Sequence, residues 1–177
     1  MHQEQSGVTL YELLMTLTLI AVLVGAGIPS FAEMGARNRL RTEINALFHA
    51  IHLARKESIM RHSVVSICPT FDGLTCQPGY DWSSGWIMFN NRDRDEPPLI
   101  DPGEPVLQVH TASKQVRITA NRRGFTLRAT QKRATNGTIV VCDRAGRVAP
   151  RALVVSYTGR PRVALENPRG EAYRCAD

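Results

Sequence analysis

Two arginines near the end of the chain, Arg160 and Arg162, have the side-chain type and spacing that phosphate binding requires. Residues two apart in an extended segment point to the same face, about 6.6 Å from each other. Each planar guanidinium can donate two hydrogen bonds to one phosphate, so the pair is suited to hold a nucleic-acid backbone. Pro161 stiffens the segment, and Gly159 permits a close approach. The same pair could instead protect an edge strand from aggregation or contact an acidic protein.

The positive charge of the chain is concentrated around this pair. Its 177 residues contain 22 Lys and Arg against 16 Asp and Glu, a formal net charge of +6. Residues 114–177 hold 14 basic and four acidic side chains, whereas residues 1–113 are slightly acidic. Such an asymmetry indicates a polyanionic partner. We expect Arg151, Arg169 and Arg174 to supplement the pair.

Catalytic and metal-binding patterns are missing from the sequence. It has no Gly-x-Ser-x-Gly, no His-Glu-x-x-His and no phosphate-binding loop, so we expect neither an enzyme nor a cofactor. His49 and His52 have no thiol or carboxylate partner at a helpful spacing and are interpreted as an exposed helix face. The acidic loop 93–101 is interleaved with arginines and is interpreted as solvated. No metal site is therefore expected.

The four cysteines favour disulfides over zinc, because they form no Cys-x-x-Cys pair. Disulfides would require an exported domain. Three pairings are possible, and the local one is favoured because it closes a short loop and ties the C-terminal tail to the strand 138–142. It joins Cys68 to Cys76 and Cys142 to Cys175.

The first thirty residues contain an apolar segment long enough for a membrane. Residues 13–28 carry no charge, and a helix over 8–28 would be about 31 Å long, the thickness of a hydrocarbon core. Pro29 is expected to end or kink this helix. A secretory signal cleaved near Ala32 and a plain membrane anchor are alternatives. The anchor does not explain Glu12, since a carboxylate in an apolar helix is costly unless it has a function.

The run from Gly7 to Leu14 resembles the type IV prepilin motif, in which a polar leader ends in glycine and a glutamate follows five residues beyond the cut. The resemblance implies a leader at 1–7, which a prepilin peptidase removes between Gly7 and Val8 before it methylates the new amine. It also implies that Glu12 pairs with the amino terminus of a neighbouring subunit during assembly. Residues 8–29 would then form a transmembrane and assembly helix, and 30–177 an exported head.

Beyond Pro29 the sequence predicts an α+β head. A helical stripe continues after the proline, and short β-branched or aromatic segments separated by turns then predict antiparallel strands. The stripe comprises Leu40, Ile44, Leu47, Ile51, Ala54 and Ser58, and the strands are expected at 63–68, 85–90, 105–110, 115–120, 125–130, 138–142, 153–157 and 162–165. Alternation predicts Val116, Ile118, Ala120, Phe125, Leu127 and Ala129 inside, and Arg117, Thr119, Thr126, Arg128 and Thr130 outside.

Over its whole length the chain resembles the FimT/GspH group of minor pilins and pseudopilins, through 54–61, 64–68, 82–89, Arg123-Gly124 and 137–142. The resemblance implies a pilin-like fold, a long N-terminal helix packed on antiparallel sheets, with a transmembrane first half and an amphipathic second half. FimT proteins that bind DNA in natural transformation carry a C-terminal Gly-Arg-x-Arg element, which Gly159 to Arg162 match.

This resemblance implies a minor type IV pilin that captures extracellular double-stranded DNA, independently of sequence, through its C-terminal arginines. Its other partners would be major and minor pilins and the prepilin peptidase. It would first cross the inner membrane once, with a periplasmic head, and later join the pilus fibre at the cell surface. The alternative is a structural minor pilin, or a type II secretion pseudopilin, that primes or caps the fibre.

Overall fold

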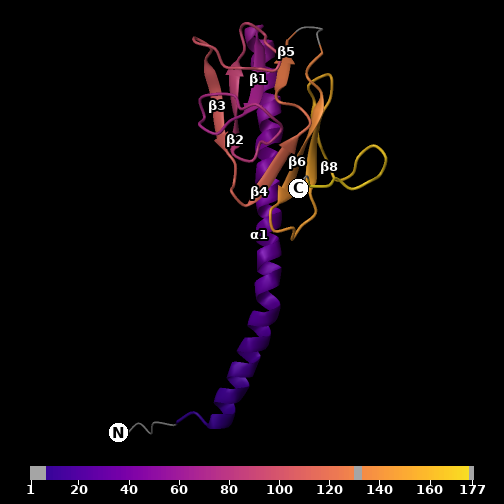
Figure 1. Ribbon diagram of the computed structural model, residues 1–177. Helices are drawn as coiled ribbons and strands as arrows, with labels where there is room; N and C mark the ends of the chain where they lie inside the picture. The colour runs from indigo at the N-terminus through magenta and orange to yellow at the C-terminus, as the bar shows by residue number, and fades with distance from the viewer. Residues whose placement is uncertain (1–6, 130–132, 176–177) are drawn as a thin grey trace. The chain divides into compact units, whose positions relative to one another are not determined.

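The computed structural model describes residues 7–129 and 133–175, which form one α-helix and eight β-strands (Figure 1). The chain divides into two compact units, Met1–Gly35 and Ala36–Asp177, which are described separately. We call Ala36–Asp177 the head. The helix α1 (Leu10–Arg61) contributes residues to both units.

The N-terminal unit consists of the first part of α1. Thr9 caps the helix, because its Oγ1 accepts a hydrogen bond from the Glu12 N–H at 3.3 Å and Glu12 Oε2 accepts one from the Thr9 N–H at 3.0 Å. The helix therefore begins at Leu10 and not at Val8. By length and composition α1 could cross a membrane, with an 18-residue window of mean hydropathy 2.1.

The proline in α1 does not end the helix. Pro29 lies inside α1, and helical geometry continues on both sides of it. A proline removes one backbone hydrogen bond, and the hydrogen bonds of the long helical segments on either side keep the helix continuous.

In the head, one face of α1 lies against the sheets. All six residues of the predicted stripe are buried, and the polar residues predicted on the opposite side, Arg41, Asn45, His49, His52 and Lys56, are exposed. The predicted amphipathic half of the helix is therefore confirmed.

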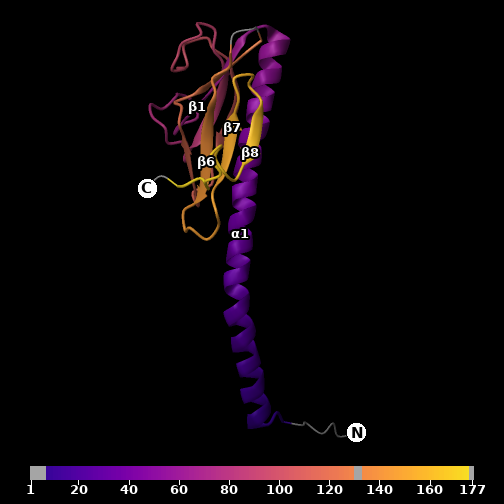
Figure 2. The same cartoon turned by 90° about the vertical axis from the view of Figure 1, so that its right-hand side faces the viewer.

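The head contains two four-stranded antiparallel sheets (Figures 1 and 2). Each predicted strand is present, with bounds that differ by at most two residues; Thr130 lies outside the described residues. Sheet A has the order β3 (Val106–Thr111), β2 (Gly85–Asn90), β1 (Val64–Pro69) and β5 (Phe125–Arg128). Sheet B has the order β4 (Val116–Ala120), β6 (Gly137–Asp143), β7 (Arg151–Val155) and β8 (Pro161–Ala164).

The hydrophobic core lies between α1 and the inner faces of both sheets. Val116, Ile118 and Ala120 point into it as predicted, and the ring of Trp82 contacts that of Phe125 with centroids 5.7 Å apart. Burial of these apolar surfaces is the main stabilising contribution to the head.

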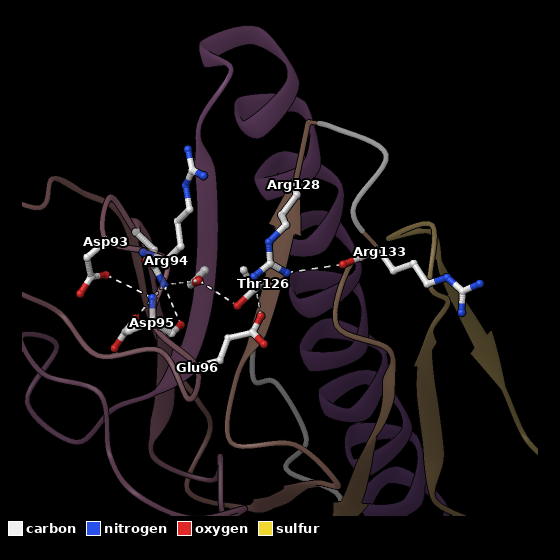
Figure 3. A network of polar contacts seen from close by, with 9 residues as sticks. Asp93, Arg94, Asp95, Glu96, Thr126, Arg128 and Arg133 are labelled. Atoms are coloured by element: carbon white, nitrogen blue, oxygen red, sulfur yellow. Dashed lines mark hydrogen bonds and ion pairs between the residues drawn. The ribbon is translucent and has the colours of Figure 1, made fainter.

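The prediction that Thr126 faces solvent is wrong. Its side chain is buried, and its hydroxyl lies 3.1 Å from Ser66 Oγ. Ser66 Oγ also accepts a hydrogen bond from Asn91 Nδ2 at 3.0 Å. Asn91 Nδ2 in turn donates to Asp95 Oδ1 at 2.9 Å, so a loop covers this end of sheet A (Figure 3). Strand alternation indicates which face a side chain occupies, but not what covers that face.

The head contains two disulfides, in the local pairing that the sequence favoured. Cys68 is bonded to Cys76 across a short loop, and Cys142 of β6 is bonded to Cys175 near the end of the chain. The second bond ties the C-terminal tail to sheet B.

Candidate nucleic-acid interface

The arginine pair lies at a hairpin between β7 and β8. The Ser156 N–H donates to the Arg160 carbonyl at 3.1 Å, and the Gly159 N–H donates to the Ser156 carbonyl at 2.9 Å. Ser156 Oγ also accepts the Arg160 N–H at 3.2 Å. These bonds fix the backbone from which both arginines project.

Gly159 has a structural position in this turn. It is buried and has a φ of +69°, a left-handed conformation that favours glycine. A Cβ at this position would lie 2.8 Å from Leu127 Cδ1 and 3.4 Å from the Ala134 Cβ. The absence of a side chain at Gly159 therefore lets the hairpin pack on β5, and its part in nucleic-acid binding stays a prediction.

Arg160 and Arg162 share the outer face of the hairpin. Strand β8 forms the edge of sheet B, and Arg162 lies opposite Val154 of β7 (Figure 2). Pro161 between them is buried, so both arginines point the other way, and both are exposed. Within the described residues, neither guanidinium has an ion-pair or hydrogen-bond partner. Two exposed cations with unused donors therefore stand next to each other.

The three supplementary arginines are placed differently from one another. Arg151 begins β7 on the same strand face as the buried Leu153, so it does not share the face of the pair. Arg174 is exposed beside Cys175, whose disulfide partner Cys142 lies on the outer face of β6.

Arg169 occupies the tip of a small hairpin in the tail. The Asn167 N–H donates to the Glu171 carbonyl at 2.8 Å, and the Arg169 N–H donates to Asn167 Oδ1 at 2.9 Å. The tail crosses from the end of β8 to Cys142, over the outer face of sheet B (Figure 2). Arg169 and Arg174 are thus on the same side of sheet B as the pair, and Arg151 is not.

One basic residue beside the hairpin was missed by sequence reasoning. The guanidinium carbon of Arg133 lies 5.3 Å from the centroid of the Tyr157 ring, and the Ala134 N–H donates to the Tyr157 carbonyl at 2.9 Å. These residues are more than twenty positions apart in the sequence, so only the fold brings them together.

Two other arginines of the basic segment, Arg128 and Arg147, form ion pairs with acids. Arg147 binds Asp143 through two bonds, Nη2 to Oδ1 at 2.8 Å and Nε to Oδ2 at 2.9 Å. Hydrogen bonds from Arg147 hold the pKa of Asp143 below its ordinary value. Arg128 Nη2 lies 2.7 Å from Glu96 Oε1. The exposed pair Arg160 and Arg162 differs from both, because neither has an acidic partner among the described residues.

The sequence family described as type II transport protein GspH matches residues 43–159. The chain belongs to this GspH family. The match covers most of the head and ends at Gly159, so Arg160 and Arg162 follow directly after it. No curated protein matches the chain.

Solved structures of two other proteins share the fold of this GspH-family chain. Two crystal structures of the type IV minor pilin FimU from Pseudomonas aeruginosa align with TM-scores of 0.53 and 0.50, at 20% and 19% identity. They cover 78% of this chain and 95% and 97% of their own. The minor pseudopilin EpsH of Vibrio cholerae aligns with a TM-score of 0.52 at 9% identity, over 71% of this chain and 96% of its own.

Family and fold together make the chain a minor type IV pilin or pseudopilin of the FimT/GspH group. The predicted pilin-like α+β fold is confirmed. Pilins and pseudopilins are structural, non-enzymatic subunits that contact one another in a fibre. The apolar part of α1 is in keeping with membrane anchoring before assembly.

Proposed function

We propose that this minor pilin binds extracellular double-stranded DNA through Arg160 and Arg162 for uptake in natural transformation. The observation that carries the proposal is the pair itself: two exposed arginines, Arg160 just before the edge strand β8 and Arg162 within it, without an acidic partner among the described residues. Their spacing suits neighbouring phosphates of one backbone.

Binding is expected to involve phosphates and not bases. The basic third of the chain contains no helix within the described residues, so it offers no recognition helix for a major groove. Arg169 and Arg174, on the same side of sheet B, add positive charge to the surface. Affinity is therefore independent of sequence and falls with salt, by about 0.9 log units per log unit of salt for each phosphate neutralised.

The remaining parts of the proposal concern export and assembly. A prepilin peptidase cleaves the leader 1–7 after Gly7 and methylates Val8. The segment 8–29 then holds the subunit in the inner membrane, with residues 30–177 in the periplasm. Of the leader, only Gly7 lies within the described residues. The bond between Gly7 and Val8 lies outside α1, which supports access by a peptidase. Glu12 pairs with a neighbouring amino terminus when the subunit enters the fibre among other major and minor pilins.

The arginine pair is tested by removing both charges. In the full chain in non-ionic detergent, fluorescence anisotropy with duplex DNA at two salt concentrations should show much weaker binding by Arg160→Ala/Arg162→Ala. The salt slope should fall by about 2, since two phosphate contacts are lost. The matched control is Arg92→Ala/Arg94→Ala, which removes two exposed arginines at the same spacing from the loop after β2.

Two results would contradict the proposal. An equal loss of affinity in both double variants would mean that DNA binding depends on the net charge of the protein and not on the positions of Arg160 and Arg162. Unchanged affinity in a folded Arg160→Ala/Arg162→Ala protein would leave the alternative role, in which the basic edge of sheet B contacts an acidic face of another pilin while the subunit primes or caps the fibre.

A further inference from the structure

We propose that a second site, a basic cleft beside the hairpin, binds a single-stranded nucleotide end of the same DNA. The cleft has a volume of about 450 Å³, within the range of about 300–1,000 Å³ that small-molecule sites have. This inference rests on the proposed function, because it adds a second contact for the same partner. A duplex is too wide for the cleft, but a single unpaired nucleotide is of suitable size.

The walls of the cleft come from separate segments of the head. Four arginines and one glutamate line it, so its net charge is positive. They are Arg122, Arg123, Arg128, Arg133 and Glu96, and the other lining residues include Tyr80, Pro97, Pro98, Asn121, Thr135 and Asn136. Cations, an aromatic ring, and amide and hydroxyl groups are what a phosphate, a base face and a base edge require.

The frame of the cleft is fixed by polar contacts at its back. Arg128 Nη2 binds Glu96 Oε1 at 2.7 Å, and Arg128 Nη1 donates to the Arg133 carbonyl at 3.4 Å (Figure 3). A Cβ on Gly124 would lie 2.3 Å from Pro98 Cγ, so the turn after β4 is pressed against the loop that follows β2. Arg128 is thus occupied in joining the walls and is not available to a ligand.

Two other cations remain for a phosphate. Arg122 Nε donates to the Asn136 carbonyl at 3.0 Å, which holds its guanidinium at the rim, and the remaining nitrogens of the group can donate to a ligand. Arg123 is exposed, and within the described residues its guanidinium has no hydrogen-bond or ion-pair partner. An exposed arginine at the rim can donate to a phosphate without first breaking an ion pair.

The cleft also offers a surface for a base. Tyr80 lines it with a ring that is more than half exposed, and the Tyr80 carbonyl accepts the Ala120 N–H at 2.9 Å, which anchors its backbone to β4. Asn121 Oδ1 accepts the Thr138 N–H at 2.8 Å, so the amide nitrogen of Asn121 can still donate to a base edge. Stacking on one aromatic ring tolerates any base.

The cleft adjoins the hairpin that carries the arginine pair. Its wall at 133–136 is hydrogen-bonded on one side to the hairpin, Ala134 N–H to the Tyr157 carbonyl, and on the other side to β5, Thr135 N–H to the Thr126 carbonyl at 3.0 Å. Figure 3 shows the Arg133 side chain directed away from Arg128. Its guanidinium carbon lies 5.3 Å from the centroid of the Tyr157 ring. A strand held by Arg160 can therefore pass Arg133 and place its unpaired end in the cleft.

The test compares three DNA probes on the full chain in non-ionic detergent: a blunt duplex, the same duplex with a short 5′-phosphorylated overhang, and 5′-phosphorylated tetrathymidylate. We expect the overhang duplex to bind about 5-fold or more tightly than the blunt one, the gain from one stacked base. Tyr80→Ala and Arg123→Ala should abolish that preference, and Tyr80→Ala should leave blunt-duplex affinity unchanged. Arg92→Ala, which removes an exposed arginine outside the cleft, should retain the preference for the overhang duplex.

The outcomes separate this inference from the proposed function. Arg160→Ala/Arg162→Ala should weaken both duplex probes and leave their ratio unchanged. Equal affinity for blunt and overhang duplexes, or a preference that survives both cleft variants, overturns the cleft site while duplex binding stands. Binding of tetrathymidylate that requires Tyr80, without duplex binding, supports the cleft and overturns the arginine pair.

Discussion

At the hairpin between β7 and β8, Gly159 and Arg160 are neighbours with opposite surroundings. The glycine is buried against Leu127 and Ala134, whereas the arginine is exposed and without a partner among the described residues. A motif such as Gly-Arg-x-Arg therefore combines a residue that shapes the turn with residues that face solvent. Substitutions at the two positions should separate stability from binding.

Gly159→Ala should destabilise the head by about 2–4 kcal/mol, because it adds left-handed backbone strain and a steric clash with Leu127. The matched control is Gly146→Ala, since Gly146 has a similar φ of +66° but open space around it. The control should lose only about 1 kcal/mol. Urea unfolding followed by fluorescence of the buried Trp82 and Trp86 measures both. Equal losses would mean that packing at Gly159 contributes nothing.

At the scale of elements, α1 is joined to strand β3 by a buried carboxylate. Glu43 is 5% exposed, its Oε2 lies 2.9 Å from His110 Nε2, and its Oε1 accepts the Ser113 N–H at 2.8 Å. The His110 ring also stacks on Trp86, with centroids 5.0 Å apart. One carboxylate thus connects the helix to the edge of sheet A.

This contact makes stability depend on pH. Burial on its own would raise the pKa of Glu43, but hydrogen bonds from His110 and Ser113 outweigh it, so the pKa lies below the ordinary 4.5. A lowered carboxyl pKa contributes stability that is complete above pH 4.5 and is lost as the pH falls through the folded-state value. Glu43→Ala should cost about 1–3 kcal/mol at pH 7.

Urea unfolding of Glu43→Ala and of the original chain at pH 7 and below pH 4 checks this prediction. The difference between the two proteins should shrink at the lower pH. Asp143, whose pKa is also lowered, acts in the same direction in both proteins and cancels in the comparison. A difference that stays constant with pH would contradict the assignment to an ionised Glu43.

The predictable parts of the fold are those with a regular pattern. The stripe from Leu40 to Ser58 and all eight strands could be predicted, because one-sided burial leaves a period in the sequence. The buried Glu43 could not be predicted, because its position beside the apolar stripe of the helix does not differ in the sequence from that of a solvated carboxylate. The cleft could not be predicted either, since Tyr80, Arg123 and Asn136 meet only through the order of strands in the two sheets.

At the scale of the whole molecule, the uneven charge of the sequence describes the basic surface only in part. Residues 114–177 carry 14 basic and four acidic side chains. Arg128, however, is paired with Glu96, which comes from the slightly acidic residues before 114, and Arg147 is paired with Asp143. The net positive charge counted along the sequence is therefore larger than the number of unpaired cations that a polyanion could bind.

The proposed route of the whole chain, from membrane to fibre, predicts one mature N-terminus. Mass spectrometry of the protein isolated from cell envelopes should find Val8 first, with a methylated amine. The bond to be cut lies in the non-helical residues before α1, and Thr9 and Glu12 cap the helix directly after it. Cleavage after Gly7 thus removes no helical residue and leaves the cap intact.

Two variants make this test specific. Gly7→Val should retain the leader, because the residue before the proposed cut is changed, whereas Glu12→Val should still be processed but should not enter fibres. A mature protein that begins at Ala32 or Glu33 would instead mean that the apolar part of α1 is removed as a secretory signal. The head would then be released without the helix that assembly requires, and any DNA it binds could not be drawn in by a fibre.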